Sequence, residues 1–104
     1  MYTVVETKIF QQYASAIWSD VEREELINWI AVHPFSGDVI PGTGGLRKVR
    51  YARDGMGKRG GARVIYYNLL GNGEIWLLIA YTKTKFDKLP ASFLNKLREE
   101  IHHG

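Results

Sequence analysis

The chain has 104 residues, of which 45% are hydrophobic and 24% are charged, as in an ordinary globular domain. The absence of cysteine excludes disulfide frameworks, thiol catalysis and cysteine-based zinc sites. No run approaches the roughly 18 apolar residues of a membrane span, and the first residues lack the basic-then-apolar layout of a signal peptide. We therefore expect a single cytoplasmic domain over residues 1–104 that does not enter a membrane.

The net charge of +3 conceals an uneven distribution along the chain. Residues 1–40 carry a net charge of −4, whereas residues 41–88 carry +7. Seven basic residues fall within residues 47–63, which contain one acidic residue. Such a cluster gains affinity for a polyanion, RNA or DNA, by neutralising phosphates and releasing counterions. A solvated basic loop is the other interpretation, and composition does not decide between the two.

The first part of the chain predicts a short strand followed by two helices. Residues 3–6 have the composition of a strand, and residues 8–18 place apolar side chains at helical spacing. Ser19 and Glu22 have the spacing of a capping box, which predicts a second helix that runs to about His33, before a proline. We expect these helices to form a hairpin that lies on a sheet.

The rest of the chain predicts three successive strands and a final helix. After a Pro/Gly-rich connector at 34–45, the expected strands span residues 46–53, 63–70 and 74–81. The Gly71-Asn72-Gly73 sequence between the last two strands is a hairpin signal, and Pro90 fits the first turn of the last helix. The order β-α-α-β-β-β-α predicts an α+β two-layer sandwich whose last three strands form an antiparallel meander.

Several familiar motifs can be excluded. Residues 55–60 match the pattern G-x-G-x-x-G, but they link two predicted strands, whereas a dinucleotide site requires a strand followed by a helix. Arg59 replaces the Ser or Thr of a phosphate-binding Walker loop. The three histidines have no spacing that suits a metal site, and no serine, histidine and aspartate have the spacing of a catalytic triad. We therefore expect neither a metal nor a cofactor.

The remaining candidates for chemistry are basic residues. Lys48 and Arg50 are two residues apart in one predicted strand, so both project from the same face. Arg63 opens the neighbouring strand, and Lys83 and Lys85 follow the third strand. Fixed cations on one surface can stabilise a phosphate that gains charge during cleavage. The competing interpretation is that these are simply solvent-facing residues of a half-exposed sheet.

Two stretches of the sequence resemble the RelE/ParE superfamily of small bacterial toxins, and its HigB branch most closely. They are Gly37–Arg50 (GDVIPGTGGLRKVR) and Gly57–Tyr67 (GKRGGARVIYY), and the likeness runs nearly without gaps through about residue 85. The resemblance implies a RelE-like fold. It also implies the toxin of a type II toxin–antitoxin system, an endoribonuclease that enters the ribosomal A site and cleaves mRNA without a metal. The implied partners are mRNA, the ribosome with its 16S rRNA, and an antitoxin with a helix-turn-helix DNA-binding domain.

The resemblance also assigns roles to single residues. The strand lysines of the family map onto Lys48 and Arg50, which would assist removal of the proton from an attacking 2′-hydroxyl. Its phosphate-binding arginine maps onto Arg63, and the base after its last meander strand maps onto Lys83. Arg63 and Lys83 would stabilise the phosphorane. The residues expected to bind RNA are Arg47, Lys58, Arg59, Tyr81 and Lys85.

Two positions depart from the family pattern. Thr84 stands where RelE has an arginine, with Lys85 as a substitute, and Leu89 stands near the position of a tail tyrosine, with Tyr81 as a replacement. Two further hypotheses therefore stay open. The first is a ParE-like inhibitor of DNA gyrase, which shares the fold, although ParE-like chains generally lack this set of cations. The second is a degenerate toxin that only binds RNA or its antitoxin.

Overall fold

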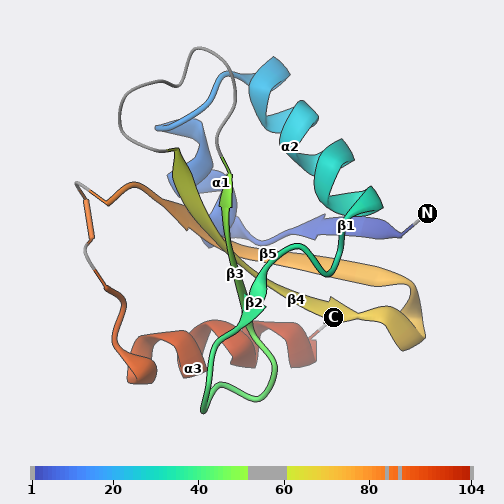
Figure 1. Ribbon diagram of the computed structural model, residues 1–104, viewed down its shortest axis with the longest axis vertical. Helices are drawn as coiled ribbons and strands as arrows, with labels where there is room; N and C mark the ends of the chain where they lie inside the picture. The colour runs from blue at the N-terminus through green and yellow to red at the C-terminus, as the bar shows by residue number, and fades with distance from the viewer. Residues whose placement is uncertain (1, 52–60, 84, 87, 104) are drawn as a thin grey trace.

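The computed structural model describes residues 2–51, 61–83, 85–86 and 88–103, which form a five-stranded mixed sheet with helices on both of its faces (Figure 1). The strands are β1 (Thr3–Glu6), β2 (Asp38–Val39), β3 (Arg47–Tyr51), β4 (Ala62–Leu69) and β5 (Glu74–Tyr81). The helices are α1 (Lys8–Ser15), α2 (Asp20–Val32) and α3 (Ala91–Glu99). The sheet order is β1-β5-β4-β3-β2, with β1 parallel to β5 and the other neighbours antiparallel. The predicted α+β class and the antiparallel meander are confirmed.

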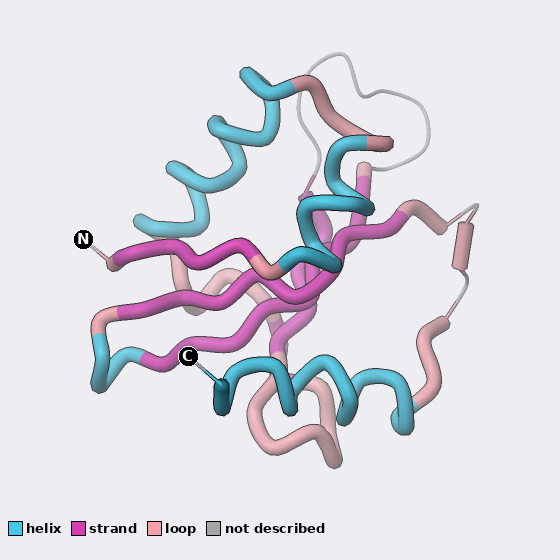
Figure 2. Tube along the Cα trace, turned by 180° about the vertical axis from the view of Figure 1, so that it is seen from behind, coloured by secondary structure: helices cyan, strands magenta, loops and turns pink. Residues whose placement is uncertain are grey.

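Each face of the sheet buries its own apolar core. Helices α1 and α2 pack on one face, where Phe10, Leu26 and Ile30 meet the inner side chains of the strands. Helix α3 packs on the opposite face through Leu94 and Leu97, as Figure 2 shows from behind. This is one layer more than the predicted two-layer sandwich, because the apolar stripe of α3 must be buried and the sheet offers an apolar surface on that side. None of the described helices is long and apolar enough to span a bilayer.

The helix boundaries follow from local hydrogen bonds. The predicted capping box of α2 is present, with Ser19 Oγ accepting from Glu22 N at 3.2 Å and Glu22 Oε1 accepting from Ser19 N at 2.9 Å. Helix α1 ends at Ser15, three residues before the predicted end. The amides of Ile17 and Trp18 both donate to the carbonyl oxygen of Ala14, at 3.0 and 2.9 Å. This tightened turn redirects the chain into the cap of α2.

The connector at 34–45 contains the short strand β2, which the sequence did not predict. The Tyr66 hydroxyl, fully buried under this segment, accepts a hydrogen bond from Gly37 N at 2.9 Å and donates one to the Pro34 carbonyl oxygen at 2.8 Å. A Cβ atom at Gly37 would lie 2.9 Å from the Lys48 carbonyl oxygen and from the Tyr66 ring, so the close approach requires glycine. The buried phenol therefore holds β2 against β3.

The Tyr66→Phe substitution is expected to lower the free energy of unfolding by about 1–3 kcal/mol, because it leaves the buried Gly37 N–H without an acceptor. Denaturant unfolding monitored by circular dichroism measures the change. Tyr67→Phe is the matched control, since Tyr67 lies on the opposite, α3-side face of the same strand. Equal stability of the two variants would contradict the proposed role of the Tyr66 hydroxyl.

Strand β5 carries a β-bulge opposite the middle of β4. Ile65 pairs with Ile79, whereas the next residue, Tyr66, pairs with Leu77. Leu78 is therefore an extra residue on β5, and its side chain is fully buried.

The side chain of Thr7 joins the start of α1 to this bulge. Its hydroxyl lies 3.0 and 3.2 Å from the carbonyl oxygens of Leu77 and Leu78, to which it donates. The same oxygen accepts from Phe10 N at 3.1 Å and so caps the helix. One threonine thus satisfies backbone groups of both elements.

Candidate nucleic-acid interface

The meander brings candidate residues of three strands into one row across the sheet. Arg50 on β3 pairs with Arg63 on β4, and Arg63 pairs with Tyr81 on β5. Directly opposed residues of antiparallel strands have Cβ atoms about 4.5–5.5 Å apart. Lys48 lies two residues before Arg50 and faces the same side, and both are exposed to solvent. We call Arg50, Arg63 and Tyr81 the arginine row; the catalytic and RNA-binding roles of these residues and of Lys48 stay predictions.

Arg63 is the half-buried cation of this row. Its Nη1 atom is buried and has no hydrogen-bond partner among the described residues. A buried guanidinium N–H without an acceptor is costly, because it has lost its hydration. A phosphate oxygen would supply the acceptor, since arginine binds phosphate through charge-assisted hydrogen bonds. Arg63 is therefore poised to bind an anion.

Tyr81 places a phenol beside the Arg63 guanidinium. The residue is 3% exposed, and its ring contacts that of Phe86 edge to face, with 6.0 Å between the centroids. Burial raises the pKa of Tyr81 because desolvation disfavours the phenolate, and the nearby Arg63 charge offsets only part of this effect. Since an unperturbed tyrosine already titrates near 10, the Tyr81 hydroxyl is protonated at neutral pH. It can donate a hydrogen bond to an anion held by Arg63.

Tyr81 is expected to ionise above pH 10, and replacement of Arg63 by methionine is expected to raise its pKa further. Methionine keeps an apolar side chain at the position paired with Tyr81 but removes the charge that stabilises the phenolate. Titration of ¹³Cζ-tyrosine NMR signals, with the Tyr81→Phe variant to assign the resonance, measures both values. A lower pKa of Tyr81 in Arg63→Met than in the parent would contradict the assigned interaction.

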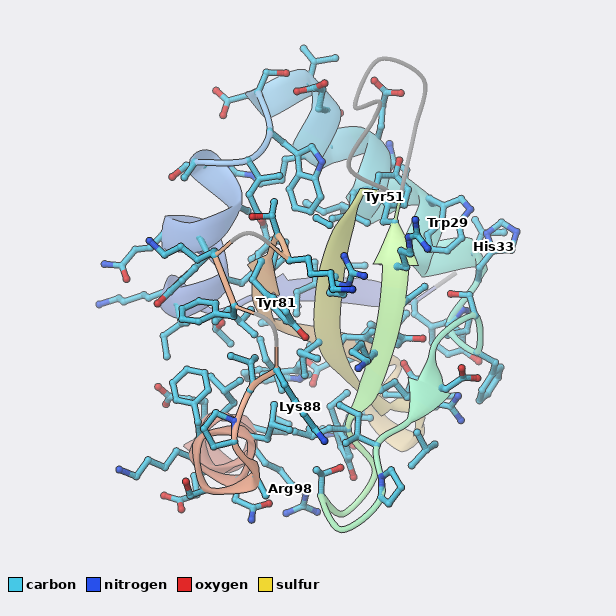
Figure 3. The ribbon with its side chains drawn as sticks, turned by 60° about the vertical axis from the view of Figure 1, so that its left-hand side comes forward. Trp29, His33, Tyr51, Tyr81, Lys88 and Arg98 are labelled. Carbon is cyan, nitrogen blue, oxygen red and sulfur yellow. The ribbon has the colours of Figure 1, made fainter. Side chains whose placement is uncertain are left out.

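A hollow of about 300 Å³ opens beside the arginine row. It is lined by Ile40, Lys48, Ile65, Tyr81, Lys88, Leu89 and Leu94. Figure 3 shows the side chains of Tyr81 and Lys88 over the same side of the sheet, Lys88 coming from the segment before α3. Sequence reasoning missed Lys88, which no strand or helix pattern includes. Its placement depends on the next residue, Leu89, whose buried side chain anchors the segment to the sheet.

The structure does not bring Arg47 to the other candidates. Its side chain faces the α2 side of the sheet, where Nη1 donates to the Gly37 carbonyl oxygen at 2.7 Å. The guanidinium also lies over the Phe35 ring, 5.1 Å from the centroid. These contacts attach Arg47 to the β2 segment, across the sheet from Lys48.

Two of the other predicted cations follow β5. Lys83 and Lys85 are exposed in a turn in which the amides of Lys85 and Phe86 donate to the Thr82 carbonyl oxygen, at 3.0 and 3.1 Å. Lys58, Arg59 and Thr84 lie outside the described residues. The structure therefore positions Lys83 and Lys85 just beyond the Tyr81 end of the row.

His33 ends α2 and stacks on Trp29, with 5.2 Å between the ring centroids. Its Nδ1 atom lies 3.0 Å from the Trp29 carbonyl oxygen. Within the described ranges, no group of three or more histidine, aspartate or glutamate side chains could hold a metal ion.

The fold can be compared with known proteins. No family model matches the sequence. The chain is similar to a solved structure of the E. coli toxin RelE, a double arginine-to-alanine mutant in the free state, with a TM-score of 0.57. The two sequences are 11% identical, and the match covers 93% of this chain and 96% of the other. The two proteins therefore share a fold, and the chain has the predicted RelE-like fold.

Proposed function

We propose that this chain is the toxin of a type II toxin–antitoxin system, a HigB-like endoribonuclease that cleaves mRNA on the ribosome and so inhibits translation in the cytoplasm. The observation that carries the proposal is the arginine row with Lys48 beside it. It gathers three cations and a protonated phenol on one face. The E. coli protein that shares this fold is itself named a toxin.

The proposed reaction is an attack of the ribose 2′-hydroxyl on the adjacent phosphate. A bond forms between O2′ and phosphorus, the bond from phosphorus to O5′ breaks, and a 2′,3′-cyclic phosphate or its hydrolysis product remains. Lys48 or Arg50 assists removal of the 2′-hydroxyl proton, and the 5′ oxygen takes up a proton as it leaves.

Charge stabilisation is the main contribution of the site in this proposal. The phosphorane carries more negative charge than the phosphate, so fixed cations stabilise the transition state more than the ground state. Arg63 supplies its buried Nη1 donor, Lys83 a second positive charge, and Tyr81 a neutral donor.

The partners follow from the same proposal. Lys58, Arg59 and Lys85 hold the backbone of rRNA or mRNA through phosphate contacts. Arg47 is left out of this set, because its guanidinium is bound to Gly37 and Phe35. A cognate antitoxin with a helix-turn-helix domain would block the basic face.

Expression in bacterial cells tests the proposal. New 5′ ends should appear within translated mRNA soon after induction, at positions fixed by the reading frame, and growth should stop. DNA breaks that depend on gyrase are scored in the same cells. DNA breaks without mRNA cleavage would favour the ParE-like alternative. The absence of both signals would favour a toxin that only binds RNA or its antitoxin.

A further inference from the structure

The hollow beside the arginine row combines an apolar lining with a basic rim. Ile65, Leu89 and Leu94 are each at most 8% exposed. Lys48 and Lys88 also line the hollow, and both residues are exposed to solvent. Among the described residues, none that lines the hollow is acidic. This composition suits a ligand with a flat apolar body and a negative charge.

The size of the hollow limits that body to one ring system. Its volume of about 300 Å³ includes space open to solvent, and the enclosed part is much smaller. The enclosed part therefore suits one planar ring system and not two stacked bases.

The hollow is also continuous with the residues proposed to bind the scissile phosphate. Tyr81 belongs to both, as a member of the arginine row and as part of the lining. Lys48 precedes Arg50 by two residues on the same face, about 7 Å along the strand. A phosphate bound at Lys48 therefore lies next to one bound at the row.

We infer that this hollow is a binding pocket for a single nucleobase of RNA, with the phosphate of that nucleotide between Lys48 and Lys88. The inference rests on the proposed function for the class of its ligand. It assigns Lys88 to RNA binding, and it places the nucleotide in the pocket next to the one cleaved at Arg63.

Methyl NMR of the full chain tests the pocket directly, with adenosine 5′-monophosphate as the probe. The nucleotide is expected to shift the methyl signals of Ile65, Leu89 and Leu94. Ribose 5-phosphate and adenosine should each bind more weakly, because each lacks half of the ligand. Lys88→Ala should weaken binding of the nucleotide about fivefold, the upper end for one solvated ion pair. Lys96→Ala removes an equal charge from the exposed surface of α3 and serves as the control.

A second variant tests the apolar part without touching a cation. Ile40→Trp puts an indole at the half-exposed wall of the hollow and should exclude the base while ribose 5-phosphate still binds. Equal affinity of ribose 5-phosphate and the nucleotide, or methyl shifts confined to other residues, would overturn the pocket.

This experiment does not depend on RNA cleavage. A parent protein that cuts mRNA but does not bind the nucleotide in the hollow would overturn the pocket and leave the proposed function intact. Nucleotide binding by a protein that cuts no mRNA would support the pocket and count against the nuclease.

Discussion

The Arg63→Ala variant is expected to fold like the parent and to lose mRNA cleavage by about 100- to 1,000-fold, the usual effect of removing one preorganised donor to a developing negative charge. Arg63 lies between Arg50 and Tyr81, and its Nη1 donor has no partner among the described residues. Removal of the unpaired buried donor relieves its desolvation cost, and loss of the half-buried side chain removes some packing. The two effects oppose each other, so stability should change by no more than about 0.5 kcal/mol. Growth arrest should disappear with the activity.

Mapping of mRNA 5′ ends, growth curves and thermal unfolding together test this expectation. Lys8→Ala is the matched control, because it removes one positive charge from the exposed start of α1. Arg63→Lys keeps the positive charge but loses the planar guanidinium with its fixed set of N–H donors, so it should recover only part of the activity. A folded Arg63→Ala variant that arrests growth as strongly as the parent would refute the assigned role of Arg63.

The second prediction with a large expected effect is that mRNA cleavage requires a translating ribosome. Purified protein is expected to leave free mRNA intact and to cut the same mRNA in a translation extract. The one histidine whose side chain is described, His33, stacks on Trp29 at the end of α2 and not at the arginine row. The row therefore lacks the side chain that titrates naturally near neutral pH. Positioning and charge stabilisation must supply most of the rate, and a ribosome can align the 2′-hydroxyl with its phosphate.

The assay compares free mRNA, mRNA in a translating extract, and mRNA in an extract whose ribosomes are stalled before the cleavage site. Cuts should appear only where ribosomes have reached, at fixed positions within codons. Binding to ribosomes should weaken steeply as salt rises, because the contacts are with phosphates. Efficient cleavage of free RNA without regard to reading frame would show that the site is self-sufficient and would contradict this mechanism.

The sequence predicts where the cations of the candidate site lie, because their placement depends on periodicity and on the order of the strands. The alternation of β3 puts Lys48 and Arg50 on one face, and the hairpin order of the meander places Arg63 beside them. The capping box of α2 and the apolar run of β5 are local patterns of the same kind. These features need no knowledge of distant contacts.

What the sequence does not predict depends on contacts between distant residues. Strand β2 lies in a Pro/Gly-rich connector and forms because Tyr66, 29 residues after Gly37, binds that segment from beneath. The side chain of Arg47 is committed to the same segment through the Gly37 carbonyl oxygen. Lys88 reaches the hollow because Leu89 is buried against the sheet. A pattern along the chain holds no information on such contacts.

The bulge in β5 decides which side chain lies opposite Arg63. If the pairing of Tyr66 with Leu77 continued as a regular ladder, Arg63 would oppose Ala80, and Tyr81 would turn toward the α2 side. The extra residue, Leu78, shifts the pairing of the rest of β5 by one position. The phenol of Tyr81, and not the methyl group of Ala80, therefore lies beside the Arg63 guanidinium. Deletion of Leu78 would remove the bulge and keep Tyr81 opposite Arg63. Deletion of Ala80, which lies beyond the bulge, would instead bring Tyr81 opposite Val64. The position of the bulge along β5 thus decides which side chain is paired with Arg63.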